Sequence, residues 1–144
     1  MKKKLLKIFL VLFGIGLFVG ICTYLYVFHK PHRNIANEKP AYTLNAFQLL
    51  DEFNVSEDSS YIKYGDKVLQ VDGKIEELSS SDTTLSIILS NPEKGISCSF
   101  EAEYCLKNKD RIKQLKIGTP VTLKGKCDGY DMIMGVVLTR CVLL

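Results

Sequence analysis

The residues that could do chemistry are few in this sequence: five cysteines and two histidines among 144 residues. His29 and His32 both precede residue 34, so the rest of the chain has no histidine for a catalytic triad or as a general base. No two cysteines form a CxxC pair, which zinc ribbons and thioredoxin-like redox sites require. The adjacent acids Glu76 and Glu77 would point to opposite faces of a strand. We therefore expect no enzyme activity, no metal site and no cofactor.

An uncharged run of 21 residues, from Ile8 to Phe28, could cross a membrane as a helix roughly 31 Å long. Four lysines precede it and fewer basic residues follow closely. This bias favours residues 1–7 in the cytoplasm, an anchor in the cell membrane at 8–28, and the remaining chain outside. A cleaved signal peptide is the alternative, disfavoured because apolar and aromatic residues continue to Phe28. Ile21 before Cys22 argues against lipidation of that cysteine.

The net charge of +3 divides unevenly along the sequence. The first 33 residues carry six basic and no acidic side chains, whereas residues 34–144 carry 13 basic and 16 acidic ones. The basicity belongs to the N-terminal segment and gives no general argument for nucleic-acid binding. Residues 29–42 are polar, contain two prolines and lack a hydrophobic period. We expect them to form a stalk before a domain at 43–144.

Hydrophobic periodicity predicts a helical start to this domain, followed by five strands. Thr43 can cap a helix in which apolar residues recur every three positions. They predict one buried stripe, made by Leu44, Phe47, Leu50 and Phe53. Ser56 can cap a second helix that ends at Gly65. A period of two then predicts strands at 69–76, 83–89, 96–101 and 121–127, with a helix at 107–115. Residues 133–144 are apolar on both faces and predict a fifth strand enclosed by other elements.

Five short strands with a helix between the third and the fourth give an all-β core in the order of an OB-fold barrel. Closure would set the third strand beside the fifth, which favours a Cys98–Cys141 disulfide in an oxidising compartment. With a turn at 128–131, Cys127 and Cys141 would lie roughly 15–25 Å apart, too far to bridge. Buried reduced thiols are the alternative for Cys98 and Cys127.

Three segments resemble the tRNA_anti-like group of small bacterial OB-fold proteins: KYGDKVLQVDGKI at 63–75, ISCSF at 96–100, and LKIGTPVTLKGKCDGYDMIMGVVLTRCVL at 115–143. The resemblance covers nearly all of the predicted domain. It implies an OB-fold in a protein that is exported or attached to a membrane, and it describes shape rather than ligand. The sequence departs from the group at Ser59 and Ser60, where a small apolar residue is more usual.

The predicted second and third strands do not favour nucleic-acid binding. OB-folds that bind single strands present aromatic rings on these strands beside a positive groove. The second strand, TTLSIILS, has neither an aromatic nor a basic residue, and Phe100 on the third shares a face with Ile96 and Cys98, which predicts a core position. The loops at 79–82 and 128–132 carry aspartates and no basic residue, so they would repel phosphate.

These two loops are instead the candidate ligand site. We expect Asp82, Tyr130 and Asp131 to contact a small ligand or another protein of the cell envelope. Packing on the barrel rim is the ordinary alternative for Tyr130.

Basic residues cluster from Lys107 to Lys126, with Asp110 as the only acid among them. A solvated helix face that balances the acidic remainder is the plain interpretation. Contact with an anionic lipid surface is the alternative. The candidate contacts are Lys107, Lys109, Arg111, Lys113 and Lys116.

The sequence as a whole predicts a single-pass membrane protein that holds an OB-fold module outside the cytoplasm. Its expected partner is an envelope protein or a small ligand. The alternative is a single-stranded nucleic-acid binder with its domain in the cytoplasm. A structural role without any ligand is a third interpretation.

Overall fold

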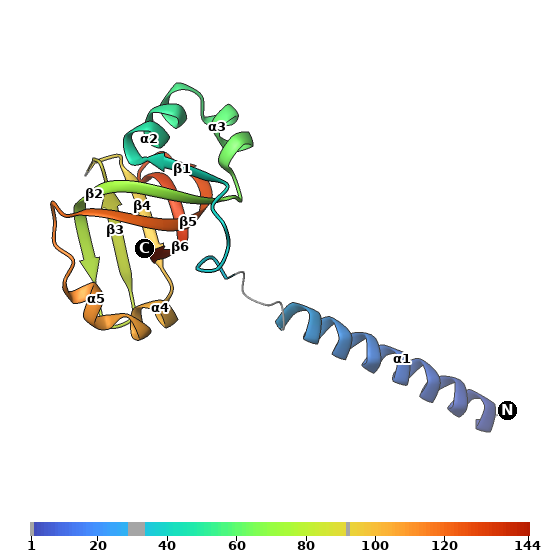
Figure 1. Cartoon of the computed structure of the whole chain (residues 1–144). Helices are drawn as coiled ribbons and strands as arrows, with labels where there is room; N and C mark the ends of the chain where they lie inside the picture. Colours follow the sequence, from blue (N-terminus) through green and yellow to red (C-terminus); the bar gives the residue numbers. More distant parts are fainter. Residues whose placement is uncertain (1, 29–33, 92) are drawn as a thin grey trace. The chain divides into compact units, whose positions relative to one another are not determined.

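The computed structural model describes residues 2–28, 34–91 and 93–144 (Figure 1). The chain divides into two compact units, residues 1–33 and 34–144. The first unit contains the helix α1 (Lys2–Phe28), in which residues 6–27 have a mean hydropathy of 2.5 and are exposed. Its length and composition suit a membrane anchor, and a signal sequence near an N-terminus has the same properties.

A closed β-barrel forms the second unit. The described strands are β1 (Tyr42–Asn45), β2 (Val68–Ser80), β3 (Leu85–Leu89), β4 (Ile96–Phe100), β5 (Pro120–Asp131) and β6 (Gly135–Leu143). Their order in the sheet is β1-β2-β3-β4-β6-β5, and the first half of β2 also pairs with β5. That pairing closes β2 to β6 into a barrel, with β1 added in parallel to β2. The predicted five-stranded OB-fold is confirmed.

Helices cover two ends of this barrel (Figure 1). At one end lie α2 (Ala46–Val55) and α3 (Glu57–Tyr64), and at the other lie α4 (Ala102–Lys107) and α5 (Lys109–Lys113). The single helix predicted at 107–115 is wrong: the helical stretch begins at Ala102 and is divided at Asn108. The Asn108 amide side chain donates to the Tyr104 carbonyl at 2.9 Å, which ends α4 there.

The helix α2 begins later than predicted because residues 42–45 pair with β2 as a strand. Its cap is Asn45, whose side chain accepts a hydrogen bond from the Phe47 amide at 2.9 Å, and not Thr43. The predicted stripe is wrong at Phe47, which is 70% exposed, because a spacing of three falls behind the 3.6-residue period. The buried residues of α2 are Ala46, Leu49, Leu50 and Phe53.

The helix α3 follows the prediction, with Ser56 as its cap and its end before Gly65. Ser60 is buried in it, at a position where the related group more usually has an apolar residue. The Ser60 hydroxyl donates to the Glu52 carbonyl at 2.8 Å, so the buried polar group is satisfied.

The turn between β5 and β6 lies at residues 132–134, whereas the sequence predicted it at 128–131. β5 therefore continues to Asp131. The register places Cys127 opposite Leu138, only three residues before Cys141. The predicted separation of Cys127 and Cys141 was too large because it assumed the earlier turn.

Residues 34–41, here called the docked segment, belong to the barrel unit, although the sequence set the domain boundary at residue 43. Ile35 is 3% exposed, and the Ala41 amide donates to the Val68 carbonyl at 2.8 Å. The Lys124 ammonium donates to the carbonyls of Ala36 and Glu38 at 2.7 and 3.1 Å. Residues 29–33 of the predicted stalk, with both histidines, lie outside the described residues.

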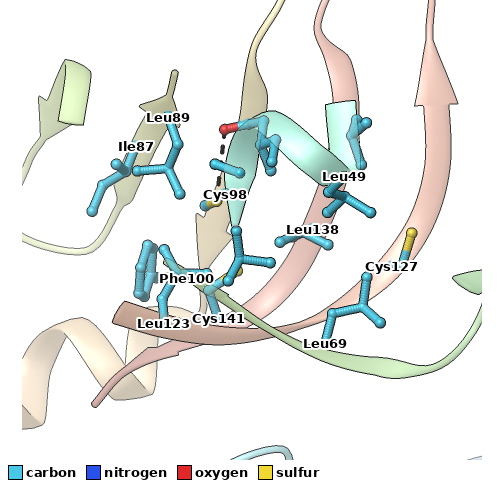
Figure 2. Close-up of a cluster of buried hydrophobic side chains, with 14 of the residues drawn as sticks. Leu49, Leu69, Ile87, Leu89, Cys98, Phe100, Leu123, Cys127, Leu138 and Cys141 are labelled. Carbon is cyan, nitrogen blue, oxygen red and sulfur yellow. Dashed lines mark hydrogen bonds between the residues drawn. The ribbon is translucent and has the colours of Figure 1, made fainter. Parts of the chain in front are cut away.

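Apolar side chains from β2 to β6 fill the barrel, and Leu49 of α2 packs against them (Figure 2). Gly125 on β5 is required by this packing. A Cβ there would lie 2.6 Å from the Cys141 Sγ and 3.1 Å from the Leu138 Cβ. The absence of a side chain at Gly125 lets β5 and β6 approach closely at this point.

Candidate binding surfaces

The outer face of β3 and β4 is lined mainly by hydroxyl groups. Ser86 lies opposite Ser99 on β4 and opposite Ser79 on β2, and Ile88 lies opposite Ser97 in the next row. The alternate residues of both strands are buried in the core. Among these outward residues there is no aromatic ring and no cation, so the face lacks the stacking and phosphate-binding groups of single-strand binders.

The two predicted ligand loops lie at opposite ends of this face. Asp82 precedes the start of β3, which pairs with the end of β4. Asp131 ends β5, at the end of the face where β4 and β6 begin. The length of β3 separates the two ends by roughly 15 Å. The structure therefore does not bring Asp82 together with Tyr130 and Asp131.

Asp131 holds the turn between β5 and β6. Its carboxylate accepts hydrogen bonds from the amides of Ile133 and Met134 at 2.8 and 2.9 Å. These bonds lower the pKa of the Asp131 carboxyl, because they favour its charged form. Met132 and Ile133 are 83% and 81% exposed on this turn. The rigid turn thus presents apolar side chains to solvent, which the sequence analysis did not single out.

Tyr130 packs on the helical end of the barrel. Its ring stacks on Phe53 with centroids 6.2 Å apart and an interplanar angle of 13°. Stacking of this kind stabilises the contact between β5 and α2. This geometry agrees with the rim-packing interpretation of Tyr130.

Two of the five basic candidates already have structural partners. Lys107 pairs with Glu103 at 2.7 Å. The Arg111 guanidinium donates to the carbonyls of Leu143, at 3.2 Å, and Leu144. Three exposed lysines remain for a surface contact: Lys109, Lys113 and Lys116.

A polar cluster joins α2 to α3. The Glu52 carboxylate accepts hydrogen bonds from the Lys63 ammonium at 2.7 Å and the Tyr64 hydroxyl at 2.8 Å. These bonds lower the pKa of Glu52, and the bond to Glu52 raises the pKa of Lys63. Lys63 also lies over the Tyr64 ring, 4.6 Å from its centroid. Each of these charges has a partner, so we interpret the cluster as a brace between the helices.

A groove of about 620 Å³ lies between the start of α2 and the strands β2 and β5. The exposed Phe47 ring lines it, together with Asp72, Lys74 and Thr122. The Thr122 hydroxyl donates to the Asp72 carboxylate at 2.6 Å, and Lys74 lies 3.6 Å from the Glu76 carboxylate. This groove could not be predicted from the sequence, because Phe47 fitted the predicted core stripe.

The cysteines at 98, 105, 127 and 141 are buried free thiols in the structure. Cys98 and Cys141 are drawn in the same part of the core (Figure 2) and interact through their side chains. Burial raises the pKa of the Cys141 thiol, and the neighbouring Cys98 raises it further. Burial also raises the pKa of Cys127 to about 11. Within the described residues, no group of three potential ligands could hold a metal ion.

The model of the tRNA_anti-like family matches residues 1–143. The chain belongs to the tRNA_anti-like family. This match confirms the resemblance seen in the sequence. No curated protein matches the sequence.

Solved structures share the tRNA_anti-like fold at low sequence identity. A "putative nucleic acid-binding lipoprotein" from Klebsiella pneumoniae is 17% identical, with a TM-score of 0.56 over 71% of this chain and 90% of that one. A "putative aspartyl-tRNA synthetase" from Leishmania major is 10% identical, with a TM-score of 0.50 over 78% of this chain and 22% of that one. The similarity extends to the fold alone.

Proposed function

We propose that this protein is a membrane-anchored binding module that holds its OB-fold domain outside the cytoplasm and carries out no catalysis. Its partner is an envelope protein or a small ligand. The observation that carries the proposal is the turn between β5 and β6, where a backbone fixed by Asp131 presents Met132 and Ile133 to solvent. An exposed apolar patch on a rigid scaffold is typical of an interaction site.

Membrane attachment is supported by α1, whose exposed apolar residues 6–27 are long enough to span a bilayer. The lysines at positions 2, 3, 4 and 7 favour a cytoplasmic N-terminus. The related Klebsiella pneumoniae protein is named a lipoprotein, which is also a form of membrane attachment. In an oxidising compartment, Cys98 and Cys141 would be the pair to form a disulfide.

Topology is tested with engineered cysteines, because the native barrel thiols are buried and would not react in the folded protein. Asp82→Cys places a thiol on the exposed loop after β2, and Lys4→Cys places one before the apolar run. A membrane-impermeant maleimide should label Asp82→Cys in intact cells, and Lys4→Cys only after lysis. The reverse pattern would contradict an extracytoplasmic domain.

Partner binding is tested with a photo-crosslinking amino acid at Ile133 in intact cells. The matched control carries the same amino acid at Ser86, on the hydroxyl face. We expect light-dependent adducts of discrete mass from position 133 and none from position 86. Equal yields at both positions would mean that the turn is not a specific interaction site.

Single-stranded nucleic-acid binding is the second candidate, favoured by the name of the Klebsiella pneumoniae protein. It requires the domain in the cytoplasm, so the labelling experiment separates the two functions. A gel-shift titration with single-stranded RNA and DNA tests it directly. Binding that weakens steeply with salt and is lost on removal of Lys109, Lys113 and Lys116 would support it.

A further inference from the structure

We propose that Lys109, Lys113 and Lys116 dock the barrel onto anionic lipid headgroups of the membrane that holds α1. The proposal rests on the membrane attachment proposed above and adds a second, electrostatic contact to it. Lys109 and Lys113 lie four residues apart on α5, and Lys116 follows in the next turn of chain. All three are exposed. They form the group called here the lysine face.

The cations that neighbour the lysine face already bind other groups of the protein. Lys107 is paired with Glu103, and Arg111 donates to the carbonyl of Leu143, the last residue of β6, and to that of Leu144. The distinction matters for the experiment, because removal of Arg111 would disturb the fold whereas removal of exposed lysines would not.

The charge of the barrel unit is strongly asymmetric around this face. Residues 102–119 carry five basic and two acidic side chains, whereas the remainder of residues 34–144 carries eight basic and 14 acidic ones. An anionic surface therefore attracts this segment and repels the rest of the unit. Clustered surface cations attract anionic lipid, and each contributes about 1 kcal/mol near a charged membrane.

The docked segment and α5 are both held by hydrogen bonds that lead to β5. Lys124 binds the docked segment, and Thr122, two residues earlier on β5, accepts a hydrogen bond from the Leu144 amide at 3.0 Å. The carbonyl of Leu144 in turn binds Arg111 of α5. The start of the barrel unit and the lysine face thus share one strand pair, β5 and β6.

The connection between the apolar helix and the barrel unit is short in sequence. Residues 29–33 alone separate them, and five residues span at most roughly 20 Å even when fully extended. A bilayer that holds α1 is therefore close to residue 34, where the barrel unit begins. This covalent limit keeps a membrane near the unit at all times, which favours lipid as the partner of its cationic surface.

Nucleic acid fits the lysine face less well than lipid. Single-strand binding combines cations with aromatic stacking platforms. The outward residues of β3 and β4 offer no ring, and Phe47, the exposed aromatic of the groove, is on α2 at the opposite end of the barrel (Figure 1). Lipid headgroups need charge alone, which Lys109, Lys113 and Lys116 supply.

The experiment uses the full chain in nanodiscs of phosphatidylcholine alone or with about one third phosphatidylglycerol, an anionic lipid. Lysine acetylation rates are measured residue by residue with mass spectrometry. We expect several-fold slower acetylation of the lysine face in the anionic bilayer, and recovery at high salt, which shortens the Debye length. Lys94, exposed between β3 and β4, is the internal control and should not change.

A second readout uses the absence of tryptophan from the sequence. Gln114→Trp places a single fluorophore within the lysine face, and Ser86→Trp places one on the hydroxyl face as the control. Brominated phosphatidylglycerol should quench the first and not the second. The added changes Lys109→Gln, Lys113→Gln and Lys116→Gln should abolish the quenching, whereas Lys94→Gln should not.

The outcomes separate this inference from the proposed function. A full chain that does not float with lipid vesicles would refute membrane attachment itself. Flotation with equal acetylation in both bilayers would refute only lipid docking by the lysine face. Protection by a single-stranded oligonucleotide, with none by anionic lipid, would overturn the proposal in favour of nucleic acid.

Discussion

Replacing Lys124 by methionine tests how the docked segment is held on the barrel. Methionine has a similar length and keeps the apolar packing of the side chain, but it removes the ammonium that binds the carbonyls of Ala36 and Glu38. The Lys124 residue is 8% exposed, so its polar contacts are largely shielded from water. The variant therefore isolates two charge-assisted hydrogen bonds between segments far apart in the sequence.

The expected loss follows from these contacts. Hydrogen bonds from a charged donor contribute roughly 1.5–3 kcal/mol each. Two effects offset much of this hydrogen-bond energy. The Lys124 ammonium is already partly desolvated in the wild type, and the freed carbonyls bind water when the docked segment loosens. We expect the free energy of unfolding to fall by about 2 kcal/mol. We also expect the Ala41 amide, which donates to the Val68 carbonyl, to exchange faster.

The assay is urea unfolding of the full chain in detergent, followed by circular dichroism, with hydrogen exchange at residues 34–41 in parallel. Lys126→Met is the matched control, because Lys126 lies two residues away on β5 and binds the exposed Asp66 and Asp128 instead. Loss of the Lys126 ammonium should lower the free energy of unfolding by less than about 1 kcal/mol. Equal stability of the two variants, with unchanged exchange at Ala41, would refute the role assigned to Lys124.

Three further predictions concern the barrel and its helices. Gly125→Ala should destabilise the fold by about 1–3 kcal/mol in urea unfolding, and Cys141→Ala in the same chain should recover part of this loss, because the added Cβ meets Cys141 Sγ. The pKa of Glu52 is lowered in the folded protein, so its contribution to the free energy of unfolding is complete above its ordinary pKa of 4.5 and is lost as the pH falls through the lower folded value. The free energy of unfolding should therefore fall less steeply with acid in Glu52→Gln than in the wild type. Alkylation of Cys127, with a pKa of about 11, should be slow at pH 8 in the native protein; rapid native labelling would contradict its burial.

Alternation of apolar and polar residues was enough to predict the strands and the barrel, because each strand has one face in the core. The same alternation could not predict that Lys124 is buried. It occupies an outward position like any solvated lysine, and only the docked segment from residues 34–41 makes that position buried. Sequence alone also missed the extension of β5 to Asp131, because DGYD has the composition of a turn while the real turn follows it.

The candidate site was predictable in part. The basic cluster is visible in the sequence, but the individual roles of Lys107 and Arg111 depend on contacts made only in the folded chain. Asp82 and Asp131 were grouped because both lie in turns, and the strand β3 separates them in space. Phe47 matched an apolar spacing of three, and it is exposed because that spacing falls behind the 3.6-residue period of α2.

The docked segment also determines how the domain responds to mechanical load. A pull applied through the N-terminus reaches the hydrogen bonds of Lys124 before any strand of the barrel. The next resistance is β1, whose parallel ladder with β2 is four residues long and is loaded from its first residue, Tyr42. The segment and β1 can therefore yield in sequence while the closed β2–β5 seam remains paired. Extension of residues 34–45, about a dozen in number, would therefore relieve tension on the chain before the barrel opens.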